Sequence, residues 1–92
     1  MNIYELSMLC VKAINQKSLP GLEKSTPSVT LQMPPSRREA RTRRLVPSGR
    51  CPIGSVLSRM GEYDIVVFDA VDLLAWCVAN SNGGIKLEGG DA

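Results

Sequence analysis

The sequence predicts a small α+β fold, with an N-terminal helix, a three- to four-stranded antiparallel sheet and a second, apolar helix in one two-layer domain. Three observations predict it. The chain has 92 residues, which is room for a single domain over residues 1–92. Apolar residues recur at helical spacing near the start and again after residue 70, and they alternate with polar residues in between. We expect residues 1–88 to form the folded core and residues 89–92 a loose C-terminal tail.

The first predicted helix covers residues 2–17. Its apolar residues, among them Leu6 and Cys10, fall on one face at helical spacing. Asn2 and Glu5 match the two positions of a capping box, in which each side chain reaches the other's backbone N–H. The pattern therefore places the start of an amphipathic helix at the very beginning of the chain.

Three strands follow from alternation and turn residues. Residues 28–33 alternate between apolar and polar and are followed by two prolines, which predicts a half-buried strand. Residues 55–59 and 63–68 predict two strands joined by a tight turn near Gly61. The continuous apolar run at 65–68 is typical of a central strand covered on both faces.

The segment between these strands has two competing local structures. Ser36 and Glu39 match a second capping box, which would start a short helix. Leu45 and Val46 favour extended chain, and Val46 also precedes a proline, which disfavours helix. We expect an exposed strand over residues 41–46, because one isolated helical turn gains little stability.

The second predicted helix covers residues 70–80. Asp69 is placed to cap it and Asp72 to stabilise its positive N-terminal end. The helix is apolar nearly all round, so we expect it either to be fully buried or to pack against a partner, and a homodimer through Ala70–Asn80 is one such arrangement. Residues 85–87 predict a short edge strand after it.

The charge of the chain is strongly separated, although the formal net charge is only +2. Residues 37–50 hold six arginines against the single acid Glu39, whereas residues 60–92 hold six acidic residues against Lys86 alone. Arginine can grip a phosphate or a carboxylate with two parallel hydrogen bonds, and a merely solvated face would use lysine as readily. The predicted partner-binding residues are Arg37, Arg38, Arg41, Arg43, Arg44 and Arg50. The predicted acidic partner-binding residues are Glu62, Asp64 and Asp72.

The composition argues against an enzyme and against a cofactor or metal. The chain has no histidine, which is the commonest general base and a common zinc ligand. Its three cysteines, Cys10, Cys51 and Cys77, have no metal-ligand or CxxC spacing, and no phosphate-binding glycine motif occurs. We expect an intracellular, cytoplasmic protein with reduced thiols, no signal peptide, no membrane contact and no small-molecule substrate.

The arginine segment instead suggests a polyanionic partner. No aromatic residue lies between the arginines, so contacts to phosphates are expected rather than base stacking. A chain that carries a basic middle and an acidic last third suits a ribonucleoprotein, where RNA phosphates lie beside basic protein channels.

In this charge pattern and its small size, the chain resembles small phage-encoded anti-CRISPR proteins, particularly the type I-F inhibitors. The stretches at 44–49 and 67–76 are also similar to those of small phage and prophage proteins. The resemblance implies a non-catalytic inhibitor, in the cytoplasm of an infected bacterial host, that binds a CRISPR surveillance complex of Cas proteins and guide RNA. Its Arg-rich surface would block hybridisation of the target DNA.

Two other functions stay open. The chain could be a small regulatory or accessory factor that binds duplex DNA, in which case the apolar helix at 70–80 would form a dimer. It could also be a structural subunit of a phage or viral particle, which would assemble as its concentration rises.

Overall fold

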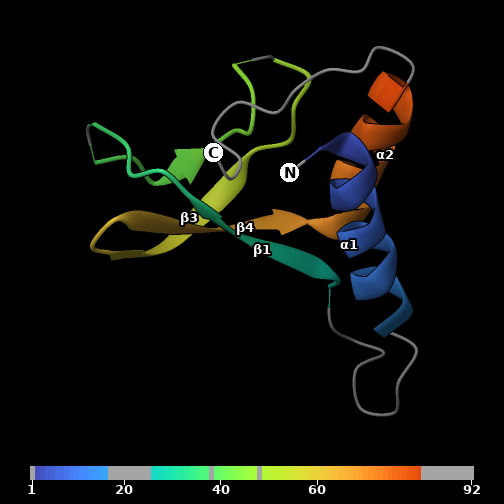
Figure 1. Cartoon of the computed structure of the whole chain (residues 1–92), viewed down its shortest axis with the longest axis horizontal. Helices are drawn as coiled ribbons and strands as arrows, with labels where there is room; N and C mark the ends of the chain where they lie inside the picture. The colour runs from blue at the N-terminus through green and yellow to red at the C-terminus, as the bar shows by residue number, and fades with distance from the viewer. Residues whose placement is uncertain (1, 17–25, 38, 48, 82–92) are drawn as a thin grey trace.

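The computed structural model describes residues 2–16, 26–37, 39–47 and 49–81 of the chain. Two helices and four strands make up this part, and all four strands join one antiparallel sheet in the order β1-β4-β3-β2, so the predicted α+β fold is confirmed (Figure 1). The elements are α1 (Ile3–Gln16), β1 (Ser28–Met33), β2 (Thr42–Arg43), β3 (Gly54–Met60), β4 (Tyr63–Asp69) and α2 (Ala70–Asn80).

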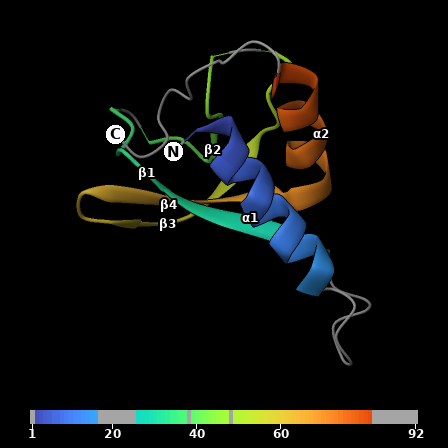
Figure 2. The same ribbon diagram turned by 45° about the vertical axis from the view of Figure 1, so that its right-hand side comes forward.

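The two helices pack against each other and gather at one end of the sheet (Figures 1 and 2). One half of the predicted capping box of α1 is present, because the Asn2 side-chain oxygen accepts a hydrogen bond of 2.7 Å from the backbone N–H of Glu5. Leu6 and Cys10 are fully buried between the helices and the sheet, as their spacing predicts. The opposite end of the sheet extends beyond the helices, and there the β3–β4 hairpin lies together with the part of the arginine segment that precedes β2 (Figure 1).

Strand β4 is central, as predicted, but only one of its faces is fully covered. Val66 and Phe68 are completely buried on the face toward the helices, whereas Ile65 and Val67 on the other face are half-buried. The prediction of a strand covered on both faces is therefore wrong. Its apolar run reflects β-branched residues on an open sheet face, which strands favour even where they are not fully buried.

Two glycines shape strand β3 and its turn. Gly61 has a φ of +61°, which a two-residue hairpin turn requires and other residues rarely adopt. Gly54 starts β3 directly over β4, and a Cβ atom there would lie 2.5 Å from Val66 Cγ1 and 2.7 Å from the Phe68 ring. Between these glycines, a bulge at Leu57 shifts the pairing with β4 by one residue.

The arginine segment forms a much shorter strand than the sequence predicts. Only Thr42–Arg43 pairs with β3, and the short helix suggested by Ser36 and Glu39 is absent from the described residues of that stretch. The expected strand over 41–46 ends early because Leu45 and Val46 turn inward and are buried in the core. Two successive residues cannot both face the core in a regular strand, since its side chains alternate between faces.

Helix α2 is neither fully buried nor fully exposed. Leu73 and Trp76 are buried, whereas Val71 and Val78 are 53% and 66% exposed. Asp69 caps the helix as predicted, because its side chain accepts a 2.9 Å hydrogen bond from the Asp72 backbone N–H. The strand expected at 85–87 and the tail at 89–92 lie outside the described residues.

Neither helix in the described part of the chain has the length and apolar character needed to cross a bilayer.

Candidate nucleic-acid interface

A buried carboxylate organises the end of the sheet that lies away from the helices. Asp64 is on the core face of β4, directly after Tyr63 at the hairpin end of the strand, and none of its surface is exposed. It follows the same period-two pattern as Val66 and Phe68, so the strand itself directs this charge inward. A charge in such a place must have partners, because an unpaired buried charge is very costly.

Arg43 and Ser36 are the main partners of Asp64. Arg43 Nη1 lies 2.7 Å from Asp64 Oδ2 and also donates a 2.8 Å hydrogen bond to the backbone oxygen of Pro34. The Ser36 backbone N–H and hydroxyl donate to the same carboxylate oxygen at 3.2 and 3.3 Å. One side chain of β4 therefore holds both β2 and the segment after β1 in place.

Arg59 completes this cluster from the neighbouring strand. It is opposite Asp64 in the β3–β4 register, and its Nε lies 3.6 Å from Asp64 Oδ1. Its Nη2 donates a hydrogen bond to the backbone oxygen of Ala40. Oδ1 itself accepts no hydrogen bond from the described residues, so the charge of Arg59 is its main source of stabilisation there. We call Asp64, Arg43, Arg59 and Ser36 the carboxylate cluster.

The carboxylate cluster keeps Asp64 ionised. Removal from water is the largest single influence on the pKa of Asp64, and it acts to raise that pKa. The hydrogen bonds from Ser36 and Arg43 and the charges of Arg43 and Arg59 act in the other direction and outweigh it. The pKa of Asp64 therefore lies below its ordinary value of 3.8.

The predicted basic residues divide into two groups. Arg43 is half-buried and engaged with Asp64, so it serves the fold. Arg37, Arg41 and Arg44 are exposed and form no ion pair with any carboxylate in the described parts of the chain. Arg38 lies outside the described residues. Among these four arginines, Arg43 is thus paired with a carboxylate, whereas Arg37, Arg41 and Arg44 are turned to solvent.

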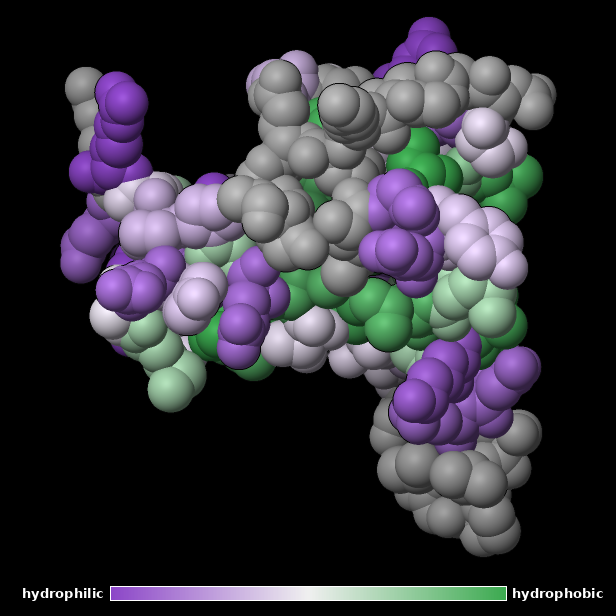
Figure 3. All heavy atoms as spheres, viewed as in Figure 1, coloured by the Kyte–Doolittle hydropathy of each residue, from purple (hydrophilic) through white to green (hydrophobic). Residues whose placement is uncertain are grey.

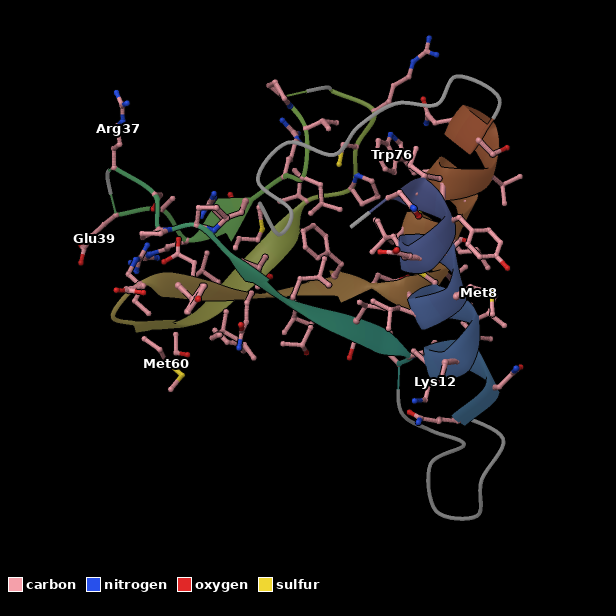
Figure 4. All side chains as sticks on the ribbon, viewed as in Figure 1. Met8, Lys12, Arg37, Glu39, Met60 and Trp76 are labelled. Atoms are coloured by element: carbon pink, nitrogen blue, oxygen red, sulfur yellow. The ribbon has the colours of Figure 1, made fainter. Side chains whose placement is uncertain are left out.

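Arg37 is at the tip of the segment, far from the helices. Figure 4 shows its side chain pointing away from the body of the protein, while Glu39 points in another direction from the same tip. Hydrophilic side chains also gather at this end in the space-filling view (Figure 3). Glu39, the one acidic residue of the segment, therefore does not point toward Arg37 (Figure 4).

Arg44 and Arg50 line a pocket beside α2. Its lining also includes the exposed Asp72 and the buried ring of Trp76. Arg44 borders a second, open pocket along residues 42–47 as well. Two of the predicted basic residues and one predicted acidic residue therefore line the same pocket.

The three predicted acidic residues are placed differently. Glu62 is exposed in the turn of the hairpin and Asp72 is exposed on the first turn of α2. Asp64 is enclosed by the carboxylate cluster and has no surface with which to touch a partner. This structural role of Asp64 was not predicted from the sequence. An acidic residue at an inward-facing position of an alternating strand indicates, however, that a basic side chain such as arginine must pair with it.

All three cysteines are buried and unpaired. Burial raises the pKa of the Cys10 thiol to about 11, and burial together with the neighbouring Cys10 and Cys51 raises that of Cys77 to about 11 as well. Cys51 lies in the core rather than in an open loop, with 2% of its surface exposed. None of these thiols is placed to act as a nucleophile. No group of three or more metal-ligating side chains occurs among the residues described.

No family model matches this chain, and no curated protein or solved structure matches it either.

Proposed function

We propose that this protein is a non-catalytic inhibitor that binds a guide-RNA surveillance ribonucleoprotein of the type I-F CRISPR class and blocks hybridisation of its target DNA. The observation that carries the proposal is the set of exposed arginines, Arg37, Arg41 and Arg44, which form no ion pair among the described residues. They project from a segment that the carboxylate cluster braces on both sides. A braced segment loses less conformational entropy on binding than a free one.

The chemistry of this surface favours phosphates over bases. Guanidinium groups bind phosphate oxygens bidentately, and the described part of the segment offers no aromatic ring for stacking. If Arg37, Arg41, Arg44 and Arg50 each neutralise one phosphate of a single strand, the logarithm of the affinity falls with the logarithm of salt concentration at a slope of roughly −2.8. A complex held by apolar contacts would have a much flatter dependence.

The exposed acidic residues suit the protein part of such a complex. Glu62 and Asp72 are exposed, so they can meet basic side chains that line a nucleic-acid channel. Contacts of both signs favour a surface that contains protein and RNA over naked nucleic acid.

A binding and competition experiment tests the proposal. Purified surveillance complex is immobilised, and the capture of this protein and the later binding of target DNA are both measured. We expect capture of the wild type and loss of DNA binding. A variant with Arg37→Ala, Arg41→Ala and Arg44→Ala should be captured at least about tenfold more weakly.

Two controls make the experiment specific. Lys12→Ala removes an exposed charge from α1 and should leave capture unchanged. Replacing the same three arginines by lysine keeps the charge but loses the planar fork, so binding should fall between the wild type and the alanine variant. Equal capture of the alanine variant and the wild type would refute the assigned surface.

The second candidate is a small factor that binds duplex DNA. The exposed arginines would bind the phosphates of the duplex, and the exposed Val71 and Val78 of α2 would form the dimer contact. Gel shifts on random duplex DNA at two salt concentrations separate the candidates, because the inhibitor is expected to bind naked duplex only weakly.

A further inference from the structure

Strand β1 forms an open edge of the sheet. In the sheet order β1-β4-β3-β2, β1 and β2 are the two edges. The β2 edge is only two residues long and is flanked by Arg41 and Arg44, which protect it from pairing with another strand. The β1 edge is six residues long, and no charged residue occurs anywhere from 26 to 36.

Every second residue of β1 directs its backbone N–H and C=O groups toward this edge. The register that sets Ser28 opposite Asp69 also sets Pro27 opposite Ala70. The Ala70 N–H donates a 3.0 Å hydrogen bond to the Pro27 oxygen, so Pro27 and Ala70 form a hydrogen-bonded pair. Hydrogen-bonded pairs alternate with non-bonded pairs in an antiparallel ladder. Val29, Leu31 and Met33 therefore face β4 with their backbone groups.

The pairing of β3 with β2, at the other edge of the sheet, independently gives the same direction for the backbone groups of β1. The Val56 N–H donates a 2.9 Å bond to the Arg41 oxygen, so Val56 turns its backbone toward β2. Its partner Val66 must then turn toward β1, where it is opposite Leu31.

Ser28, Thr30 and Gln32 are left with N–H and C=O groups directed outward. Their side chains are exposed, and no backbone bond to these three residues from outside the ladder occurs among the described residues. Unpaired backbone groups in a row are a template for another strand. Natural edges of this length normally carry a lysine, an internal proline or a bulge to prevent such pairing, and β1 has none of these.

We propose that two copies of this protein pair antiparallel through their β1 edges and form one continuous sheet. With Thr30 opposite Thr30 of the second copy, Ser28 is opposite Gln32, and each outward backbone group finds a partner. The arrangement is self-complementary, as a two-fold interface requires. All side chains that meet on the outer face, serine, threonine and glutamine, can form hydrogen bonds across the strands. An unrelated strand would match this edge only through its backbone, so the second copy is the better fit.

This dimer differs from one made through α2, and it does not depend on the proposed function. The two arginine segments follow the C-terminal ends of the paired β1 strands, so they would lie at opposite ends of the joint sheet.

Sedimentation equilibrium from low to high micromolar concentrations tests the proposal. The wild type should form a reversible dimer. Thr30→Lys and Thr30→Glu each place like charges opposite each other at the two-fold axis, so each variant alone should dimerise at least about fivefold more weakly. An equimolar mixture of the two variants should regain dimerisation, which also shows that both variants are folded.

A cysteine pair adds a matched control. Thr30→Cys should cross-link two chains under mild oxidation, because the new thiols meet at the axis, whereas Ser28→Cys should not, because its partner is Gln32. The native thiols are buried and do not interfere. A wild type that stays monomeric throughout overturns the proposal. So does a dimer that Val71→Glu dissociates while Thr30→Lys leaves it intact, because that result assigns the contact to α2.

Discussion

At the scale of single residues, Asp64 has the greatest influence on the candidate site. It is the only fully buried charged side chain among the described residues, and its carboxylate connects β4 to Arg43 of β2 and to Ser36. Ion pairs of this kind are often no more stable than apolar packing, but the loss of one partner leaves the other buried and unpaired. The cluster therefore serves mainly to fix the geometry of the arginine segment.

We predict that Asp64→Asn destabilises the fold more than the loss of any other described acidic residue, and that it changes the acid sensitivity. The pKa of Asp64 is lowered in the folded state, so its contribution is fully present above about pH 4 and is lost as the pH falls below its unfolded value. Urea denaturation at pH 7, 5 and 3 measures this. Wild type should lose stability between pH 5 and 3, whereas Asp64→Asn should start lower and lose less. Glu62→Gln is the control, and an equal loss in all three proteins would contradict the prediction.

Gly54 is the second residue on which the fold depends. Gly54→Ala should destabilise the protein by about 1–3 kcal/mol, because the new methyl group would overlap the Val66 side chain and the Phe68 ring. Chemical denaturation measures the loss. Gly49→Ala is the matched control, since an added Cβ meets nothing within 4 Å there, and it should change stability by less than about 0.5 kcal/mol.

At the scale of elements, local pattern predicts most of the structure. The alternation at 28–33 gives β1 with its observed bounds, and the Asp69 cap gives the start of α2. The arginine segment could not be predicted in the same way. Its local signals, a capping box and residues that favour extended chain, do not decide the structure, because Leu45 and Val46 enter a core formed by distant elements. Burial of this kind depends on tertiary contacts that periodicity does not contain.

Asp69→Ala tests the start of α2. The substitution removes the oxygen that accepts the Asp72 N–H, so unfolding should become easier by about 1 kcal/mol. Thermal unfolding followed by circular dichroism measures the change. Asp69→Asn keeps a capping oxygen and should cost only a few tenths of a kcal/mol; a cost equal to that of alanine would show that charge, rather than the hydrogen bond, supports the helix.

At the scale of the whole molecule, the helices lie at one end of the sheet and the tip of the arginine segment around Arg37 lies at the other, whereas Arg44 and Arg50 line a pocket beside α2 (Figure 4). The sequence predicts the layers and the separation of charge, and the structure adds where these lie. It could not be predicted that one of the six arginines faces a buried aspartate, because nothing local links Arg43 to Asp64, 21 positions away. The side of α2 that is exposed could not be predicted either, since an apolar helix has no polar face to indicate which side is in contact with solvent.

Leu6→Ala tests whether the helix layer and the sheet share one core. Leu6 is fully buried, so its truncation should cost about 2–5 kcal/mol, whereas Leu9→Ala on the same helix, where the side chain is 38% exposed, should cost clearly less. Unfolding should remain a single transition whether it is followed by far-UV circular dichroism or by the fluorescence of the buried Trp76. Two separated transitions would contradict a shared core.

The salt dependence of binding to the surveillance complex tests the central claim most directly. Affinity is measured at several salt concentrations for the wild type and for the variant with Arg37, Arg41 and Arg44 changed to alanine. The wild type should have a slope near −2.8 on logarithmic axes, and the variant should retain only about a quarter of it, roughly −0.7. A variant whose slope and affinity match those of the wild type would contradict the claim that these exposed guanidinium groups hold a phosphate-rich partner.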